Sequence, residues 1–437
     1  FGERVVLNMS FFPKEGNPLW GQYSTKAVAH AVEVYSRFTF DYPYPVSISV
    51  LTGRGGGMEY PMMTFNGGKP EPDGTYTEGL KWSLIGVIIH EVGHNFFPMI
   101  VNSDERQWGW MDEGMNTFLE YLAEQQWSRT FGERNGPAYS VIDYMKGDKS
   151  RIRPIMTGSD IDLNYGANAY DKTSAGLNIL RESILGRELF DYAFKEYARR
   201  WMFKHPMPAD FFRTMEDASG MDLDWFWRGW FFGTDHVDLA IEDVKWYRAG
   251  TGDPKQDKAV QNEKDNRSRN RYISNIRNAK EIKKTAEERD SSLKDFYNSY
   301  DSKAVYPLDT KEYKEYLESL TAGEKALLES GYNYYQVDLA NGGGMVMPVI
   351  LKFEYADGSE SVERIPAEIW RRTNDRVSKV FVTKKEITAI LLDPFLETAD
   401  VDVRNNRWWI TEGPDYFKVI KGDRPTSMNM MQRSRKK

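Results

Sequence analysis

The 437-residue sequence contains no cysteine, and only five of its residues are histidine. Disulfide bonds, thiolate metal ligands and a cysteine nucleophile are therefore excluded. It also lacks a run of about 18 uninterrupted apolar residues, so we expect no membrane span. The net charge of −7 argues against a nucleic-acid partner. Hydrophobic residues make up 40% of the chain, enough material for the cores of two or three domains.

Two of the five histidines stand in the segment His90-Glu91-Val92-Gly93-His94. Positions four apart lie on the same face of a helix, so His90 and His94 can bind one metal ion through their imidazole nitrogens. Glu91 then lies beside the metal and can act as a general base. Because the preceding residues are apolar, we expect a largely buried helix that Pro98 ends or bends.

A second helix is predicted from Trp110 to Tyr121. Glu113, separated from His94 by eighteen residues, is the expected third ligand, and Glu120 lies on the same face seven residues later. Glu120 is a candidate acceptor for the outer ring N–H of a ligand histidine. An HExxH segment also occurs by chance in helices that bind no metal, so the distant glutamate is what favours a metal site.

Taken together, these segments resemble the aminopeptidase N family of gluzincin zinc peptidases, whose signature is HExxH followed by eighteen residues and a glutamate. Gly56-Gly57-Met58-Glu59-Tyr60 is similar to that family's GxMEN motif, with tyrosine in place of asparagine. Tyr170-Asp171-Lys172 is similar to its YxK segment. The resemblance covers about the first 240 residues and includes an aromatic segment, 224–232.

The resemblance implies one zinc ion per chain, bound by His90, His94 and Glu113, with Glu91 as the general base. It also implies that the hydroxyl of Tyr170 stabilises the oxyanion of the transition state. Without the resemblance, Tyr170 would be interpreted as an ordinary half-buried tyrosine. Two imidazoles and a carboxylate suit zinc best, although cobalt or manganese could occupy the same site.

The glycine-rich motif is the expected substrate-binding segment. Gly56, Gly57 and Met58 would let the backbone pair with an extended peptide. Glu59 would bind the free α-amino group of the substrate. The alternative is a flexible glycine turn between two strands.

The fold class predicted is α+β. Residues 1–242 are expected to form a thermolysin-like domain, with a small sheet and a helical lobe on either side of the metal. A charged, mainly helical connector is expected over 243–330, a small β-sandwich over 331–410 and a tail over 411–437. Within these limits we predict a helix over 24–38, a strand over 44–51 and a hairpin that turns at 356–359.

Three functions remain open at this stage. The leading one is a zinc aminopeptidase acting on peptides or proteins; the others are a zinc endopeptidase with an open cleft and an inactive scaffold that binds a partner. Side-chain preference and oligomeric state are not predicted.

The chain opens with Phe1-Gly2-Glu3, without methionine. In relatives a β-domain precedes the catalytic domain, so we expect this chain to be a fragment or a processed product that lacks it. An extracytoplasmic location is favoured, and a cytoplasmic one remains open.

Overall fold

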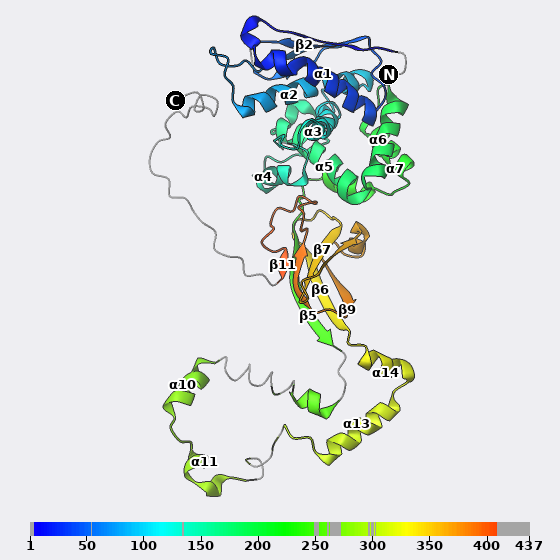
Figure 1. The fold of residues 1–437 in the computed structure, drawn as a ribbon. Helices are drawn as coiled ribbons and strands as arrows, with labels where there is room; N and C mark the ends of the chain where they lie inside the picture. The colour runs from blue at the N-terminus through cyan, green and yellow to red at the C-terminus, as the bar shows by residue number, and fades with distance from the viewer. Residues whose placement is uncertain are drawn as a thin grey trace.

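The computed structural model describes residues 4–53, 55–132, 135–248, 253–259, 262, 272–295, 298, 301 and 303–408. Figure 1 shows three parts along the chain: a lobe of helices with a sheet at one side, a pair of smaller sheets, and a loop of helices beyond them. The mixed α+β class predicted from the sequence is confirmed. In the described part of the chain, no helix combines the length and the apolar character that crossing a bilayer requires.

The N-terminal sheet has the strand order β1-β2-β4-β3. Its strands are β1 (Leu7–Phe11), β2 (Val46–Leu51), β3 (Gly57–Met58) and β4 (Met63–Asn66). The strand β2 pairs in parallel with β1 and β4, whereas the edge strand β3 is antiparallel to β4. The helix α1 (Leu19–Phe38), preceded by the short η1 (Lys14–Gly16), packs against this sheet and against α2. The helix and strand predicted for this region are confirmed.

The helix α2 (Glu78–Gly93) carries the HExxH segment. It begins where the side chain of Thr77 accepts a hydrogen bond from the Leu80 N–H at 3.0 Å. A wide turn, η2 (Asn95–Ile100), follows, and within it Phe97 has an extended backbone. A proline disfavours the helical conformation of the residue before it. The helix therefore does not continue past Phe97, as predicted from Pro98.

The second predicted helix begins as the wide turn η3 (Trp110–Gly114) and continues as α3 (Met115–Trp127). The helix α3 packs against both α1 and α2. The rest of the lobe consists of η4 (Ala138–Val141), α4 (Ile142–Lys146), η5 (Ser159–Ile161), η6 (Gly166–Lys172), α5 (Thr173–Ile179), η7 (Leu180–Ile184), α6 (Arg187–Trp201), α7 (Pro208–Ser219), α8 (Asp224–Phe226) and η8 (Trp227–Phe232).

The aromatic segment at η8 closes the core of the lobe. Trp230 is fully buried, and its indole N–H donates to the carbonyl of Lys172 at 2.7 Å. Gly176 lies so close to this indole that a Cβ there would overlap it. The segment therefore holds η6, the turn that contains Tyr170, through its contact with Lys172.

Two small sheets follow the lobe. One has the order β5-β6-β9 and the other the order β11-β10-β7-β8. Their strands are β5 (Leu239–Arg248), β6 (Asn333–Asn341), β7 (Val349–Tyr355), β8 (Glu360–Ile365), β9 (Arg376–Thr383), β10 (Ile387–Leu392) and β11 (Arg407–Trp408), with the short η10 (Ala367–Trp370) between β8 and β9.

The two sheets face each other. The Phe353 and Phe381 rings meet at 4.9 Å between centroids, and the Tyr335 hydroxyl accepts the Ile387 N–H at 2.9 Å. The predicted hairpin is confirmed, since β7 and β8 pair from Val349–Ile365 to Glu354–Glu360. The boundary predicted after residue 242 falls inside β5, because that boundary followed a change in composition whereas β5 is defined by its pairing with β6.

Between β5 and β6 the chain forms the helices α10 (Ile273–Glu281), α11 (Ala286–Arg289), η9 (Ser291–Leu293), α13 (Pro307–Ser319) and α14 (Ala322–Glu329). The side chain of Thr321 and that of Glu324 cap each other's backbone N–H, at 3.3 and 2.8 Å, and so start α14. Residues 411–437, the predicted tail, lie outside the described residues.

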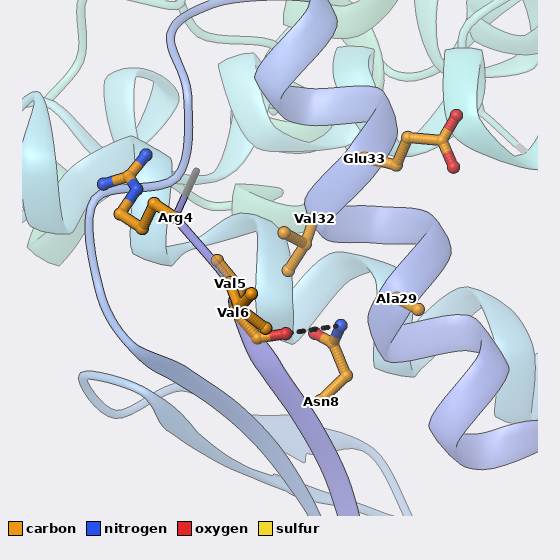
Figure 2. Close-up of a pocket in the computed structure, with 7 residues that line it drawn as sticks. All are labelled: Arg4, Val5, Val6, Asn8, Ala29, Val32 and Glu33. Atoms are coloured by element: carbon orange, nitrogen blue, oxygen red, sulfur yellow. Dashed lines mark hydrogen bonds between the residues drawn. The ribbon is translucent and has the colours of Figure 1, made fainter. Parts of the chain in front are cut away.

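A hollow of about 410 Å³ lies between the start of β1 and the exposed side of α1 (Figure 2). It is lined by Arg4, Val5, Val6 and Asn8 on one side and by Ala29, Val32 and Glu33 on the other. These residues contribute nothing to the cluster described next.

Candidate metal centre

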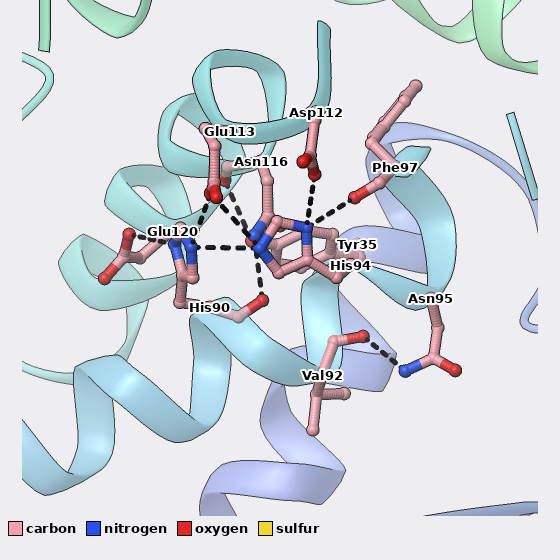
Figure 3. Close-up of polar contacts among 10 residues, drawn as sticks. All are labelled: Tyr35, His90, Val92, His94, Asn95, Phe97, Asp112, Glu113, Asn116 and Glu120. Atoms are coloured by element: carbon pink, nitrogen blue, oxygen red, sulfur yellow. Dashed lines mark hydrogen bonds and ion pairs between the residues drawn. The ribbon is translucent and has the colours of Figure 1, made fainter. Parts of the chain in front are cut away.

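Three side chains predicted as metal ligands converge in the lobe (Figure 3). His90 lies in the last turn of α2, His94 just after it and Glu113 in η3. The Nε2 atoms of the two histidines are 3.1 Å apart, and they lie 3.2 and 3.3 Å from Glu113 Oε2. The three donor atoms therefore form a nearly equilateral triangle.

This triangle fits a tetrahedral zinc ion. Zinc bonds to nitrogen and oxygen are about 2.0–2.1 Å long, which places two ligands of a tetrahedron about 3.3 Å apart. The donor set of two imidazoles and one carboxylate is typical of catalytic zinc sites, where the fourth position stays open. The residues present therefore suit zinc in both chemistry and spacing.

The outer nitrogen of each imidazole also has a hydrogen-bond partner. His90 Nδ1 donates to Glu120 Oε2 at 2.9 Å, so Glu120 lies where the sequence placed it. His94 Nδ1 lies 3.0 Å from the carbonyl oxygen of Phe97 and 3.1 Å from Asp112 Oδ1. These contacts hold the Nδ1 protons outward and leave both Nε2 lone pairs free for a metal.

The sequence did not reveal a further support beneath His90. Asn116 donates from its side chain to the His90 carbonyl at 2.8 Å. The hydroxyl of Tyr35, on α1, donates to Asn116 Oδ1 at 2.9 Å. Gly93 lets the three helices approach, because a Cβ there would overlap Asn116 and Tyr35. Only the packing of α1, α2 and α3 brings these residues together.

The electrostatics of the cluster favour a cation. Burial lowers the pKa of His90, but Glu120 and Glu113 outweigh it and raise that pKa to about 10. Burial raises the pKa of Glu113, but the two histidines outweigh it and hold the pKa well below its usual value. The carboxylates thus attract positive charge to the positions of the Nε2 atoms.

Glu91 points to the same place without joining the triangle. Burial is the largest effect and raises the pKa of Glu91 to about 7, and the neighbouring charges have smaller effects. Its Oε2 atom is buried and has no hydrogen-bond partner among the described residues. A buried acceptor left free in this way is typical of a group that acts on a ligand.

The glycine-rich motif forms one wall of the site. Gly57 and Met58 make up β3, the edge strand of the sheet, and Gly56 has a positive φ of 80°. A Cβ on Gly57 would overlap the carboxylate of Glu91. A single ligand atom of Glu59 lies within 4.8 Å of atoms of both His94 and Asp112. The motif is therefore beside the metal cluster, as its spacing in the sequence suggests.

Tyr170 lies in η6, beside His90. Its ring stacks on the ring of His90, with centroids 5.8 Å apart and planes inclined by 14°. Burial, followed by the charge of Glu113 and a hydrogen bond to it, raises the pKa of Tyr170 well above its usual value. The hydroxyl consequently keeps its proton at neutral pH and can donate it in a hydrogen bond.

Two further residues lie near Tyr170: Tyr165, which was not singled out from the sequence, and Lys172, which belongs to the YxK-like segment. The Tyr165 ring meets the Tyr170 ring edge to face, with centroids 5.9 Å apart. Lys172 is fully buried, and its amine donates to the Gly233 carbonyl at 3.4 Å. Burial, followed by the charge of Lys149, lowers the pKa of Lys172 to about 7. Both help to fix the turn. Lys172 stands at the spacing of the YxK-like segment, whereas Tyr165 stands at no spacing that would signal its place from the sequence.

The fold and the cluster together define the class as a single-metal site of the HExxH type, in an α+β protein. Residues 23–230 match the peptidase family M1 domain. This part of the chain is thus similar to the domain of peptidase family M1, which confirms the resemblance drawn from the motifs and indicates zinc as the cofactor. The expected absence of a preceding β-domain stays a prediction.

Curated relatives agree with this assignment. Aminopeptidase M1-D of Oryza sativa subsp. japonica is 23% identical over 224 residues, which cover 48% of this chain and 25% of the relative. Glutamyl aminopeptidase of Bos taurus is 24% identical over 230 residues, covering 51% of this chain and 24% of the relative. The chain spans about a quarter of the length of these relatives.

A solved structure resembles most of the chain. Legionella pneumophila aminopeptidase A, in complex with aspartic acid, superposes with a TM-score of 0.57 at 13% identity. The match covers 90% of this chain and 36% of that one. At this identity the likeness concerns the fold alone.

Proposed function

We propose that this chain is a zinc-dependent peptidase that removes residues from the N-terminus of peptides. The observation that carries the proposal is the convergence of a zinc-sized donor triangle, a free carboxylate on Glu91 and a protonated hydroxyl on Tyr170. Hydrolysis of a peptide bond needs a nucleophile, a base and an oxyanion donor in one place.

Each residue then has a distinct task. The chemistry that a bound zinc supplies is Lewis acidity, which makes water acidic enough to serve as a nucleophile near neutral pH. His90, His94 and Glu113 hold the ion. Glu91 accepts the proton of the attacking water and passes it to the departing amine. Tyr170 donates its hydroxyl hydrogen bond to the carbonyl oxygen of the scissile bond as that oxygen becomes negative.

Exopeptidase action follows from the glycine-rich segment and Glu59. The edge strand β3 has a free side on which an extended peptide can form backbone hydrogen bonds through Gly56, Gly57 and Met58. Glu59 then lies where the α-ammonium group would end the peptide, and a carboxylate there selects for that charge. A substrate with a blocked N-terminus would leave Glu59 without a partner, which costs binding energy.

The test is the digestion of a peptide mixture in which half of the peptides are N-acetylated. Mass spectrometry should show stepwise loss of N-terminal residues from the free peptides only, and no cleavage with a chelator. Glu91→Gln is the matched control, because it keeps the size of the side chain and removes the base. Internal cuts in both halves would instead identify an endopeptidase, and the absence of metal-dependent cleavage would identify a scaffold.

We also propose the finer architecture expected from the sequence. Residues 1–242 form a thermolysin-like domain, 243–330 the helical connector, 331–410 a β-sandwich-like domain and 411–437 a tail. The pairing of β5 with β6 supports adding residues 239–248 to the β-sandwich-like domain. Limited proteolysis followed by mass spectrometry would locate the boundaries. We further propose an extracytoplasmic location, which fractionation of the source cells tests.

A further inference from the structure

The described residues between β5 and β6, which lie within 253–332, form an arm at the end of the molecule away from the metal centre (Figure 1). Arg248 and Asn333 are paired in the β5–β6 ladder, so the arm leaves and re-enters the sheet at one point. None of its described residues is buried. The arm therefore contributes nothing to the core of the chain that carries it.

The helices of the arm are too short to be stable by themselves. The helix α10 has 9 residues, α13 has 13 and α14 has 8. Isolated helices below about 12–15 residues are marginal in water, so helices of this length depend on packing of an apolar face. Such apolar residues are present and exposed: Ile273 is 60% exposed and Leu308 62%. The arm thus requires a partner surface.

The charges of the arm are divided between its two halves. The stretch 273–289, which spans α10 and α11, has five basic and three acidic residues. The stretch 307–329, which spans α13 and α14, has three basic and six acidic residues. The basic residues of the first are Arg277, Lys280, Lys283, Lys284 and Arg289, and the acidic residues of the second are Asp309, Glu312, Glu315, Glu318, Glu324 and Glu329.

Charge and apolar residues share one stripe on α10. Ile273, Ile276, Arg277, Lys280 and Glu281 follow the i, i+3, i+4, i+7, i+8 spacing of a single helix face, which therefore carries a net positive charge. This stripe combines an apolar ridge with positive charge.

The helix α13 has the complementary stripe. Leu308, Lys311, Glu312, Glu315 and Tyr316 follow the i, i+3, i+4, i+7, i+8 spacing, with Lys311 Nζ 3.8 Å from Glu315 Oε1, so the stripe carries a net negative charge. Tyr316 is 39% exposed and Leu308 more so. The apolar residues of the two stripes can pack together while their charges attract.

One contact at the base of the arm already joins the two halves. Lys258 Nζ lies 2.5 Å from Asp309 Oδ2 and donates to the Ala304 carbonyl at 2.7 Å. It fixes the first turn of α13 and leaves the stripes of α10 and α13 uncovered. In Figure 1 these two helices lie on opposite sides of the arm.

We propose that the arm is a dimerisation element, in which α10 of one copy packs on α13 of a second copy of this chain. In a two-fold symmetric dimer the contact between α10 of one copy and α13 of the other occurs twice, in the same geometry. The two arms alone can therefore form both contacts. The second copy is favoured over an acidic membrane or a nucleic acid because the acidic half would be repelled by either. The inference goes beyond the proposed peptidase activity.

The test is the mass of the full chain in solution, measured by analytical ultracentrifugation over a range of concentrations. The wild type should be a dimer that weakens toward about 1 M salt, where charges are screened beyond about 3 Å. Arg277→Glu with Lys280→Glu should weaken the dimer at least tenfold, since like charges then face each other in both contacts. Glu312→Lys with Glu315→Lys should do the same.

Mixing the two variants tests whether the partner of the arm is a second copy of this chain. Each contact between unlike variants again pairs opposite charges, so the mixture should dimerise although neither variant does so alone. A wild type that stays monomeric overturns the proposal. So does a dimer that is insensitive to both reversals. A variant that carries all four changes in one chain should also be compared with the mixture. If that variant dimerises and the mixture does not, the proposal is overturned, because α10 and α13 would then pair within one chain.

A control removes the arm altogether. Replacing residues 249–332 by an Asn-Gly turn suits the paired ends of β5 and β6. This variant should be monomeric while its zinc content and peptide hydrolysis match those of the wild type. Because the readout is mass, the dimer proposal can fail or hold whatever the outcome for the peptidase.

Discussion

The two histidines proposed as zinc ligands are supported unequally, and this predicts unequal effects of two substitutions. Among the described residues, the Nδ1 atom of His90 has one acceptor, Glu120. His94 has two, the carboxylate of Asp112 and the backbone carbonyl of Phe97. Glu120→Ala therefore leaves an imidazole unheld, whereas Asp112→Ala leaves the backbone acceptor in place.

The magnitude follows from what is lost. Removing the outer partner of a ligand histidine typically weakens metal binding about 10- to 100-fold, or about 1.4–2.7 kcal/mol. We expect Glu120→Ala to fall in this range and Asp112→Ala to lose less than about tenfold, since the Phe97 carbonyl still orients His94. Glu120→Gln should lie between the wild type and Glu120→Ala, because its amide oxygen still accepts the hydrogen bond without the charge.

Zinc affinity can be measured by competition with a zinc-binding dye after removal of the metal. Circular dichroism of each metal-free variant controls for folding. Equal losses for Glu120→Ala and Asp112→Ala would refute the reasoning, as would an unchanged affinity in Glu120→Ala. Either result would mean that the helices, rather than the outer hydrogen bonds, orient the imidazoles.

Three further predictions concern other parts of the chain. Tyr170→Phe should lower kcat about 10²- to 10³-fold with zinc content unchanged, which hydrolysis assays and metal analysis check; normal kcat would remove Tyr170 from catalysis. Gly57→Ala should displace the Glu91 carboxylate and lower kcat about 10²-fold, again with zinc retained, and full activity would contradict the close approach. Burial raises the pKa of Asp400 to about 6, so its contribution to stability is present below about pH 4 and lost as the pH rises through 6. Guanidinium unfolding should therefore show Asp400→Asn gaining about 2–3 kcal/mol on the wild type between pH 4 and 7, and a constant difference would refute this.

The convergence of the candidate ligands could be predicted because their geometry is local. His90 and His94 share a helix face by spacing alone, and Glu113 and Glu120 share another. The contact between Glu120 and His90 required only that the two helices pack against each other through these faces. Residues that act through tertiary packing could not be predicted. Asn116 and Tyr35 meet beneath His90 only because α1, α2 and α3 converge at Gly93.

The C-terminal half shows the same division. The β7–β8 hairpin has a local turn and alternating residues, so its position was predictable. By contrast, β5 and β6 pair across the whole arm, and no local pattern links residues so far apart. A change in composition at residue 243 marked the approach to the arm and not the end of the preceding domain.

The direct pairing of Arg248 with Asn333 also sets an order for folding. Closing a loop of about 84 residues costs about 2.7 kcal/mol more chain entropy than closing a four-residue turn. The β7–β8 hairpin should consequently form early and offer its sheet to β10, while β5 and β6 join last. The same arm that we assign to association would thus slow the completion of the sheet beneath it, by about a hundredfold if this closure limits the rate.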